Sequence, residues 1–493
     1  MDPVLVFSII AAYFSILVLI SWFTSRDSSN ATFFTGNRQS PWFVVAFGMI
    51  GASLSGVTFI SIPGEVGTPI SGVEPQLRAF SYFQIVIGYL LGYFIIARIL
   101  LPLYYKMNLV SIYTYLARRY GKRTYKTGSL FFLLSQTMGA ALRLFLVAGV
   151  LQIAFFDSVG VPFIVTVTIT LALIWVYTYR SGIKTIVYTD TMQTLFMILA
   201  VGVTIWYLVR ELDLSFADYT RLIEDHEYSK IFFWDWKSSR YFWKQFFAGA
   251  FIVVVMTGLD QNMMQKNLTC RNLKEAQKNM YWFSAILVPV NFLFLCLGML
   301  LYIYAQRNGI SLPERSDDLY PILALNHFTI FIGIVFLLGI IAAAFSSADS
   351  ALTALTTAFC VDFMNLEEKT EQQQKMTRLR VHIGFSFILF LVIVIFRIIN
   401  DDSVISAVFT VAGYTYGPLL GLFSFGLFTK RQVIDKYVPV IAVLSPVLTY
   451  IISLNSQALF WGYQFGFEVL ILNGLLMFLG LLLITKKGTR STL

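Results

Sequence analysis

The chain has 493 residues, of which 57% are hydrophobic and 13% are charged, and its mean hydropathy is +0.72. Soluble domains hold about 45–50% apolar and about 25% charged residues, so this composition excludes a soluble protein. The net charge of +9 would suit a nucleic-acid binder. Here, however, the basic residues stand in alternate loops, so membrane topology explains them and we expect no nucleic-acid partner.

Apolar blocks of about 20 residues follow one another along the chain, and this pattern predicts helices that cross a lipid bilayer rather than a membrane barrel. We predict an all-α polytopic membrane protein, one transmembrane domain over 1–493, in the plasma (cytoplasmic) membrane. The first block has no basic leader or cleavage site, so we expect a retained helix. The 13 predicted spans are 4–23, 42–63, 80–104, 128–156, 161–178, 186–209, 243–264, 280–304, 328–362, 381–399, 404–428, 437–455 and 465–485.

The distribution of basic residues predicts the orientation of the chain. With the N-terminus outside, the loops on the inside hold 24 of the 36 Lys and Arg residues. An excess of Lys and Arg marks the cytoplasmic loops of membrane proteins. We therefore predict an outside N-terminus and an inside C-terminus.

Two corresponding spans carry small and polar residues where the other spans are apolar. One reads GMIGASLSGVTFISIPG (48–64) and the other reads MTGLDQNMMQK (256–266). Such residues can simply allow close helix packing. In corresponding positions, however, they indicate the broken first helices of two inverted repeats. The predicted arrangement is an extra helix (4–23), repeat 1 (42–209), repeat 2 (243–428) and two C-terminal helices (437–485).

Four of the charged residues inside predicted spans are candidates for a function, because a charge in the membrane costs about 2.5–3.5 kcal/mol and therefore needs a partner. One acid, in TDT (189–191), suits either a helix N-cap or a bound cation. The arginine could pair with a membrane acid, or it could hold a solute carboxylate by two hydrogen bonds. The four residues are Arg143, Asp190, Asp260 and Asp349.

The stretch AAAFSSADSALTAL (342–355) places its polar residues on one side of a helix and its apolar residues on the other. Hydrogen bonds between helices would account for the hydroxyls. They do not account for Asp349, which needs a cation or a proton. Hydroxyl, carboxylate and carbonyl oxygens are the ligands of a hard cation such as Na⁺.

Several motifs together resemble the sodium:solute symporter family, which includes sodium/glucose, sodium/proline and sialic acid symporters. They are SLSGVTFISIPG (53–64), TD (189–190), DQNMMQK (260–266), AAAFSSADSALTAL (342–355) and VDF (361–363). The resemblance covers nearly the whole chain. It implies a LeuT-type fold of five plus five helices in inverted repeats, with alternating access and no cofactor beyond Na⁺ as the coupling ion.

The resemblance also implies site residues. The main sodium site would use Gly51, Leu54, Ala343, Ser346 and Ser347. A second cation site, which some members have, would use Asp190, Ser346, Asp349 and Ser350. The solute would contact Ser55, Thr58, Gln84, Asp260 and Gln261, with Arg143 as the candidate for a carboxylate. Asp349 stands where family members carry Ser or Thr, so with Asp190 it could hold an ion more tightly or share a proton.

The favoured function is therefore sodium-coupled import of a small polar solute: a sugar, an acidic sugar or another organic acid. The alternatives are a proton-coupled symporter of the same fold and a transporter-like membrane sensor. A sensor of this architecture usually carries a soluble output domain, and this sequence ends soon after KKGTR (486–490). An enzyme is not expected, because no nucleophile–base or zinc motif surrounds the three histidines.

Overall fold

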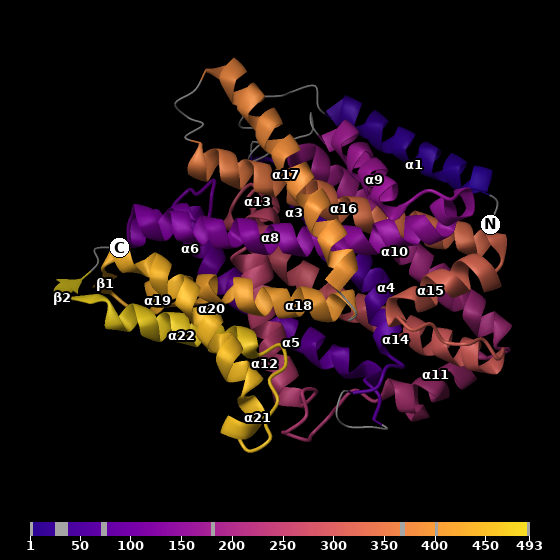
Figure 1. The fold of residues 1–493 in the computed structure, drawn as a ribbon. Coiled ribbons are helices and arrows are strands. Elements are labelled where there is room, and N and C mark those ends of the chain that lie inside the picture. The colour runs from indigo at the N-terminus through magenta and orange to yellow at the C-terminus, as the bar shows by residue number, and fades with distance from the viewer. Residues whose placement is uncertain are drawn as a thin grey trace.

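The computed structural model describes residues 3–24, 38–70, 76–178, 183–364, 370–399 and 403–490. Long helices lie alongside one another, and the N and C ends of the chain lie at opposite ends of the bundle (Figure 1). The helices of the first half are α1 (Pro3–Thr24), α3 (Trp42–Ser53), α4 (Gly56–Glu65), α5 (Tyr82–Ile95), α6 (Leu101–Lys106), α7 (Thr114–Arg119), α8 (Lys122–Leu151), α9 (Phe163–Thr178), α10 (Ile183–Glu211) and α11 (Phe216–Asp225).

The second half is also helical and ends in two short strands. Its helices are α12 (Phe242–Val253), α13 (Gln261–Asn267), α14 (Leu273–Arg307), α15 (Leu319–Ile322), α16 (Ile330–Phe363), α17 (Glu371–Ile399), α18 (Val404–Thr415), α19 (Gly417–Phe428), α20 (Val438–Leu454), α21 (Ser456–Leu459) and α22 (Val469–Leu483). Strands β1 (Arg431–Val433) and β2 (Thr485–Arg490) pair antiparallel, at the left of Figure 1.

Each predicted span has a helix or a pair of helices at its place in the described residues. Seven helices are long and apolar enough to cross a membrane, and three bent pairs bring this number to ten. Three shorter apolar helices lie over Phe7–Ile20, Phe163–Trp175 and Val469–Leu483. The fold is therefore the predicted all-α membrane fold, whereas the number of 13 crossings stays a prediction.

Three of these helices are interrupted. The α3–α4 pair bends by 53° and Phe242–Gly258 meets α13 at 70°, at the two places that the small and polar residues predicted. The α18–α19 pair bends by 47°, which was not predicted. There Pro418 stands in the first turn of α19. Proline has no backbone N–H, so it cannot donate the hydrogen bond that would continue α18 into α19.

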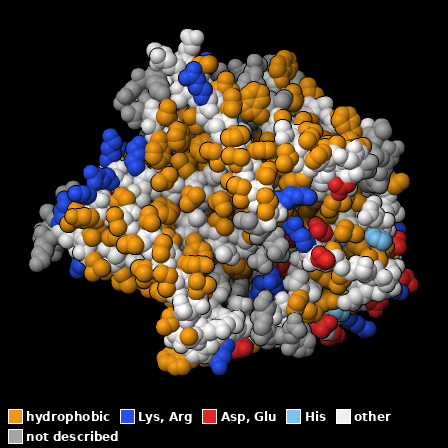
Figure 2. All heavy atoms as spheres, viewed as in Figure 1, with side chains coloured by type: hydrophobic (Ala, Val, Ile, Leu, Met, Phe, Trp, Pro, Cys, Tyr) orange, Lys and Arg blue, Asp and Glu red, His pale blue; other side chains and the backbone are white. Residues whose placement is uncertain are grey.

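The outside of the bundle is apolar. Helix α17 exposes Ile383, Phe387, Leu391 and Ile395, one residue per helical turn, so one side of this helix suits lipid. On the face seen in Figure 2, hydrophobic side chains cover the middle, the charged side chains at the left end are Lys and Arg, and acidic side chains lie at the right and the bottom together with further Lys and Arg. This separation of charge agrees with a bilayer around the middle of the bundle.

Helix α16 lies at the centre. Of its most apolar window, 71% is buried within the protein, against 28% for α17. It packs against α8, α10 and α17, and also against both α3 and α4. The polar stretch 342–355 therefore faces other helices, beside the break between α3 and α4.

Candidate functional site

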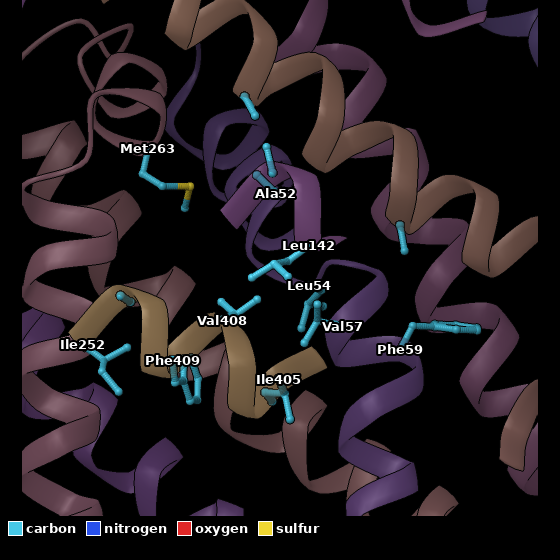
Figure 3. Close-up of a cluster of buried hydrophobic side chains, with 14 of the residues drawn as sticks. Ala52, Leu54, Val57, Phe59, Leu142, Ile252, Met263, Ile405, Val408 and Phe409 are labelled. Atoms are coloured by element: carbon cyan, nitrogen blue, oxygen red, sulfur yellow. The ribbon is translucent and has the colours of Figure 1, made fainter. Parts of the chain in front are cut away.

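A cavity opens where the interrupted helices meet. Its wall comes from the α3–α4 break, α5, α8, α12, α13, α14 and α18. The space that no protein atom fills is about 870 Å³, part of it open to solvent, which is room for a small solute. Apolar side chains form one part of this wall, and Figure 3 shows Leu54 and Val57 of the break facing Val408 of α18.

Four of the predicted solute residues line this cavity: Ser55, Thr58, Arg143 and Asp260. Asp260 also fixes the local backbone. Its Oδ1 accepts a hydrogen bond from the amide of Met263 at 3.1 Å and so caps α13, as acids do at helix N-termini. Its Oδ2 accepts a hydrogen bond from the hydroxyl of Tyr416 at 2.6 Å. Tyr416 lies at the α18–α19 bend and lines the cavity too, and the sequence did not single it out.

The other two predicted solute residues, Gln84 and Gln261, are not among the residues that line this cavity. The amide of Gln84 donates to the carbonyl of Arg240 at 3.0 Å, and its oxygen accepts from the amide of Phe233 at 3.2 Å. The amide group of Gln261 bonds the backbone of Val110 and Ile112 at 2.8 and 3.0 Å. Both side chains are fully buried. In this structure both side chains hold neighbouring backbone segments in place, and their contact with a solute stays a prediction.

Arg143 is half-buried and faces the cavity. It belongs to none of the ion pairs within 4.0 Å among the described residues. Asp260, the predicted partner, is hydrogen-bonded to Tyr416 and Met263 instead. The guanidinium thus keeps its five N–H donors available on the wall of the cavity.

A second polar cluster lies behind the cavity, around Asp190 of α10. Ser346 of α16 donates a hydrogen bond to Asp190 Oδ1 at 2.6 Å, and Ser350 lies 3.5 Å from Oδ2. The ammonium of Lys266 donates to the same Oδ2 at 2.6 Å, and neither side chain of this ion pair is exposed. Asp349 is also fully buried on α16. The predicted second cation site therefore contains a cationic side chain of the protein.

The break between α3 and α4 frees backbone oxygens. In a continuous helix the amide of Ser55 would bond the carbonyl of Gly51, but here it bonds the carbonyl of Ser53 at 3.1 Å. Leu54 lies between the two helices with ψ of 80°. Carbonyl groups next to a helix end lack an intrahelical partner, so both carbonyls are available as cation ligands.

Ser347 adds a hydroxyl that fits a cation. It is buried on α16, 3% exposed, and its Oγ has no hydrogen-bond partner among the described residues. A buried polar atom without a partner is costly and calls for an explanation. An ion would supply one, since freed carbonyls and hydroxyls are the donor set that a hard cation requires. This chemistry fits the predicted set of sodium ligands, and the set itself stays a prediction: Gly51, Leu54, Ala343, Ser346 and Ser347.

Gly51 is expected to tolerate no larger residue, because α10 lies against it. A Cβ at this position would stand 2.2 Å from Thr194 Oγ1 and 2.8 Å from the carbonyl oxygen of Asp190. We expect Gly51→Ala to destabilise the protein by about 1–3 kcal/mol, measured as thermal unfolding in detergent. Gly139→Ala on α8 is the matched control, because its Cβ would meet nothing within 4 Å. Equal stability of the two variants would contradict the close α3–α10 packing.

A buried ion-pair cluster joins α4 to α18. Glu65 at the end of α4 accepts from Arg78 at 2.5 Å and lies 3.5 Å from Arg240. The hydroxyls of Ser403 and Ser406, at the start of α18, donate hydrogen bonds to Glu65 Oε1 at 2.7 and 2.9 Å. Since α4 and α18 both line the cavity, this cluster holds two of its walls together at one end. The sequence did not single out Glu65.

Interrupted helices around a polar cavity, next to a buried oxygen-rich cluster, define a secondary active transporter. The model of the sodium:solute symporter family matches residues 33–434, so the chain belongs to this family.

Similar proteins agree with this membership. The chain is 24% identical to the sodium/sialic acid symporter SiaT of Proteus mirabilis (strain HI4320), over 89% of this chain and 88% of SiaT. It is 24% identical to the human sodium/iodide cotransporter, over 80% of this chain and 61% of that protein. These and other relatives are transporters.

Solved structures show the same fold. The structure of a Na⁺-coupled sialic acid symporter in a substrate-bound outward-open state superposes with a TM-score of 0.80 at 20% identity, covering 98% of this chain and 99% of that chain. The closed conformation of Mhp1, a nucleobase-cation-symport-1 transporter, superposes with a TM-score of 0.55 at 14% identity, covering 92% and 94%. The chain therefore has the LeuT-type fold.

Proposed function

We propose that this protein is a sodium-coupled symporter that imports an acidic sugar of the sialic acid class by alternating access. The observation that carries the choice of solute is Arg143, a cation on the cavity wall that belongs to no ion pair among the described residues. A guanidinium binds a carboxylate by two parallel hydrogen bonds. Ser55, Thr58 and Asp260 would bind the hydroxyls of the sugar. The relatives named sialic acid symporters support the same class.

The main sodium ion would sit behind the α3–α4 break. Its ligands would be the carbonyls of Gly51 and Leu54 on one side, and Ala343, Ser346 and Ser347 of α16 on the other. The same break carries Ser55 and Thr58 into the cavity. Sodium would thus fix the part of the wall that the solute contacts, which couples the two binding sites.

Transport requires the cavity to open to each side in turn. We infer that the Glu65 cluster closes the outer end, because it ties α4 to α18 beside the cavity. This assignment rests on the proposed orientation, with the N-terminus outside and the C-terminus inside, and with repeats over 42–209 and 243–428. A tenfold inward gradient of one sodium ion supplies about 1.4 kcal/mol, which is enough for about tenfold accumulation of the solute.

Binding of solute to the purified protein tests this proposal. The dissociation constant of N-acetylneuraminic acid should be lower in NaCl than in KCl, by a factor of about 5–150, the usual range of coupling between two sites. Thermodynamic reciprocity requires the solute to tighten sodium by the same factor. Equal affinity in the two salts would contradict sodium coupling, and failure of every acidic sugar to bind would contradict the solute class.

Arg143→Gln is expected to weaken binding of N-acetylneuraminic acid by about 10–150-fold, the value of a hydrogen bond to a charged group at about 1.5–3 kcal/mol. Sodium binding measured without solute should not change, because Arg143 is not among the predicted sodium ligands. Arg143→Lys serves as the comparison: it keeps the charge but loses the two-pronged geometry, so it should recover binding only in part. Full affinity in Arg143→Gln would show that no carboxylate binds there.

A further inference from the structure

Lys266 is a buried cation that the proposed mechanism does not use. It lies in the last turn of α13, the short half-helix that follows the break after Gly258. Its side chain is fully buried, and its ammonium donates to Asp190 Oδ2 at 2.6 Å. A buried charge of this kind needs a partner, and the carboxylate of Asp190 provides one across two different helices.

The ammonium occupies a position built for a monovalent cation. Ser346 donates to one oxygen of Asp190 at 2.6 Å, and Ser350 approaches the other at 3.5 Å. Together with Asp349, these three side chains are the oxygen donors that the family resemblance implies for a second cation. An ammonium group and a sodium ion carry the same charge and are both attracted to carboxylate oxygens. A sodium ion at Asp190 would have to displace Lys266 or stand beside another positive charge.

The charges of the cluster support a single additional ion. Asp349 is fully buried on the same helix as Ser346. The carboxylate of Asp190 and the ammonium of Lys266 already neutralise each other. A second sodium ion would leave an excess of positive charge in a buried region.

We propose that the ammonium of Lys266 is a built-in cation that takes the place of a second sodium ion, so that this protein binds one sodium ion, at the main site. The inference rests on the proposed sodium-coupled function and specifies its stoichiometry. It also gives the pair a positioning role. The Lys266–Asp190 contact holds α13, which Asp260 caps at its N-terminus, against α10.

Counting bound sodium tests this proposal without any solute. Equilibrium binding of ²²Na⁺ to the full-length protein, purified in detergent, should give one sodium ion per chain. Lys266→Met removes the charge and keeps an unbranched side chain, so it should bind two. Lys266→Arg keeps the charge and should bind one. Adding Ser347→Ala to Lys266→Met should bring the number back to one, because the main site is then lost while the opened site remains.

The outcomes separate this inference from the proposed function. Two sodium ions on the wild-type chain would overturn the built-in cation and leave sodium coupling intact. One sodium ion on a folded Lys266→Met variant would overturn it as well. If that variant cannot be purified, the number of sodium ions bound by the wild-type chain still tests the proposal. The double variant Asp190→Asn with Lys266→Met, which lacks both charges, should bind one ion. No saturable sodium binding to any variant would instead refute the proposed function.

Discussion

Alanine at both Ser346 and Ser347 is expected to abolish sodium-driven solute accumulation in a protein that still folds. The two hydroxyls are the side-chain ligands of the proposed main site, and each ligand lost should weaken sodium binding at least about tenfold, or 1.4 kcal/mol. The pair should therefore raise the sodium concentration for half-maximal transport about 100-fold or more. The measurement is the sodium dependence of uptake into proteoliposomes.

The single variants distinguish the two hydroxyls. Ser347 has no hydrogen-bond partner among the described residues, so Ser347→Ala should weaken sodium binding at little cost in stability, since it removes a buried polar atom that lacks a partner. Ser346 also bonds Asp190 at 2.6 Å, so Ser346→Ala should weaken sodium binding and lower stability too. Thr356→Ala, on the same helix, is the control, because Thr356 bonds the Leu352 carbonyl. Wild-type sodium affinity in the double variant would remove these serines from the site.

Asp190→Asn is expected to be among the most destabilising changes in the chain. It keeps the shape of the side chain but leaves the ammonium of Lys266 buried without a counter-charge. Breaking one side of a buried ion pair costs about 3–5 kcal/mol. The measurement is thermal unfolding of the purified variant in sodium-free buffer, where no bound ion can compensate.

Removing the second charge should restore much of this loss. The double variant Asp190→Asn with Lys266→Met lacks both charges of this pair, and replacing a buried pair by uncharged groups is often nearly neutral. A double-mutant cycle over the two positions gives the coupling directly. Asp190→Asn with wild-type stability, or a double variant no better than the single, would show that the two side chains do not form the ion pair described.

The fold followed from local patterns, which is why the sequence predicted it well. Apolar blocks mark the helices, and small and polar residues at 48–64 and 256–266 mark two of the breaks, since both are features of the segment itself. The third bend had only Gly417 and Pro418 inside an apolar block as its signal. Helices α8 and α14 begin at Lys122 and Leu273, several residues before the predicted spans. Their first turns are basic or polar, and hydropathy detects only the part inside the bilayer.

The site was predicted less completely, because it depends on contacts between distant segments. Residue type identified Arg143 and Asp260 but could not show that Gln84 and Gln261 turn away from the cavity. Lys266 lies two residues beyond the predicted span 243–264 and therefore fell in a predicted inside loop, although it follows Asp260 by little more than one turn and a half of helix. Its partner Asp190 lies 76 positions away in sequence, and no local pattern reveals such a pair.

The most direct test of the central claim is uptake of radiolabelled N-acetylneuraminic acid into proteoliposomes that contain only this protein. An inward sodium gradient should drive accumulation above the external concentration, and an equal potassium gradient should not. One sodium ion and one carboxylate together carry no net charge, so a negative interior should leave the accumulation unchanged. Accumulation that persists without sodium and follows an inward proton gradient would contradict sodium coupling.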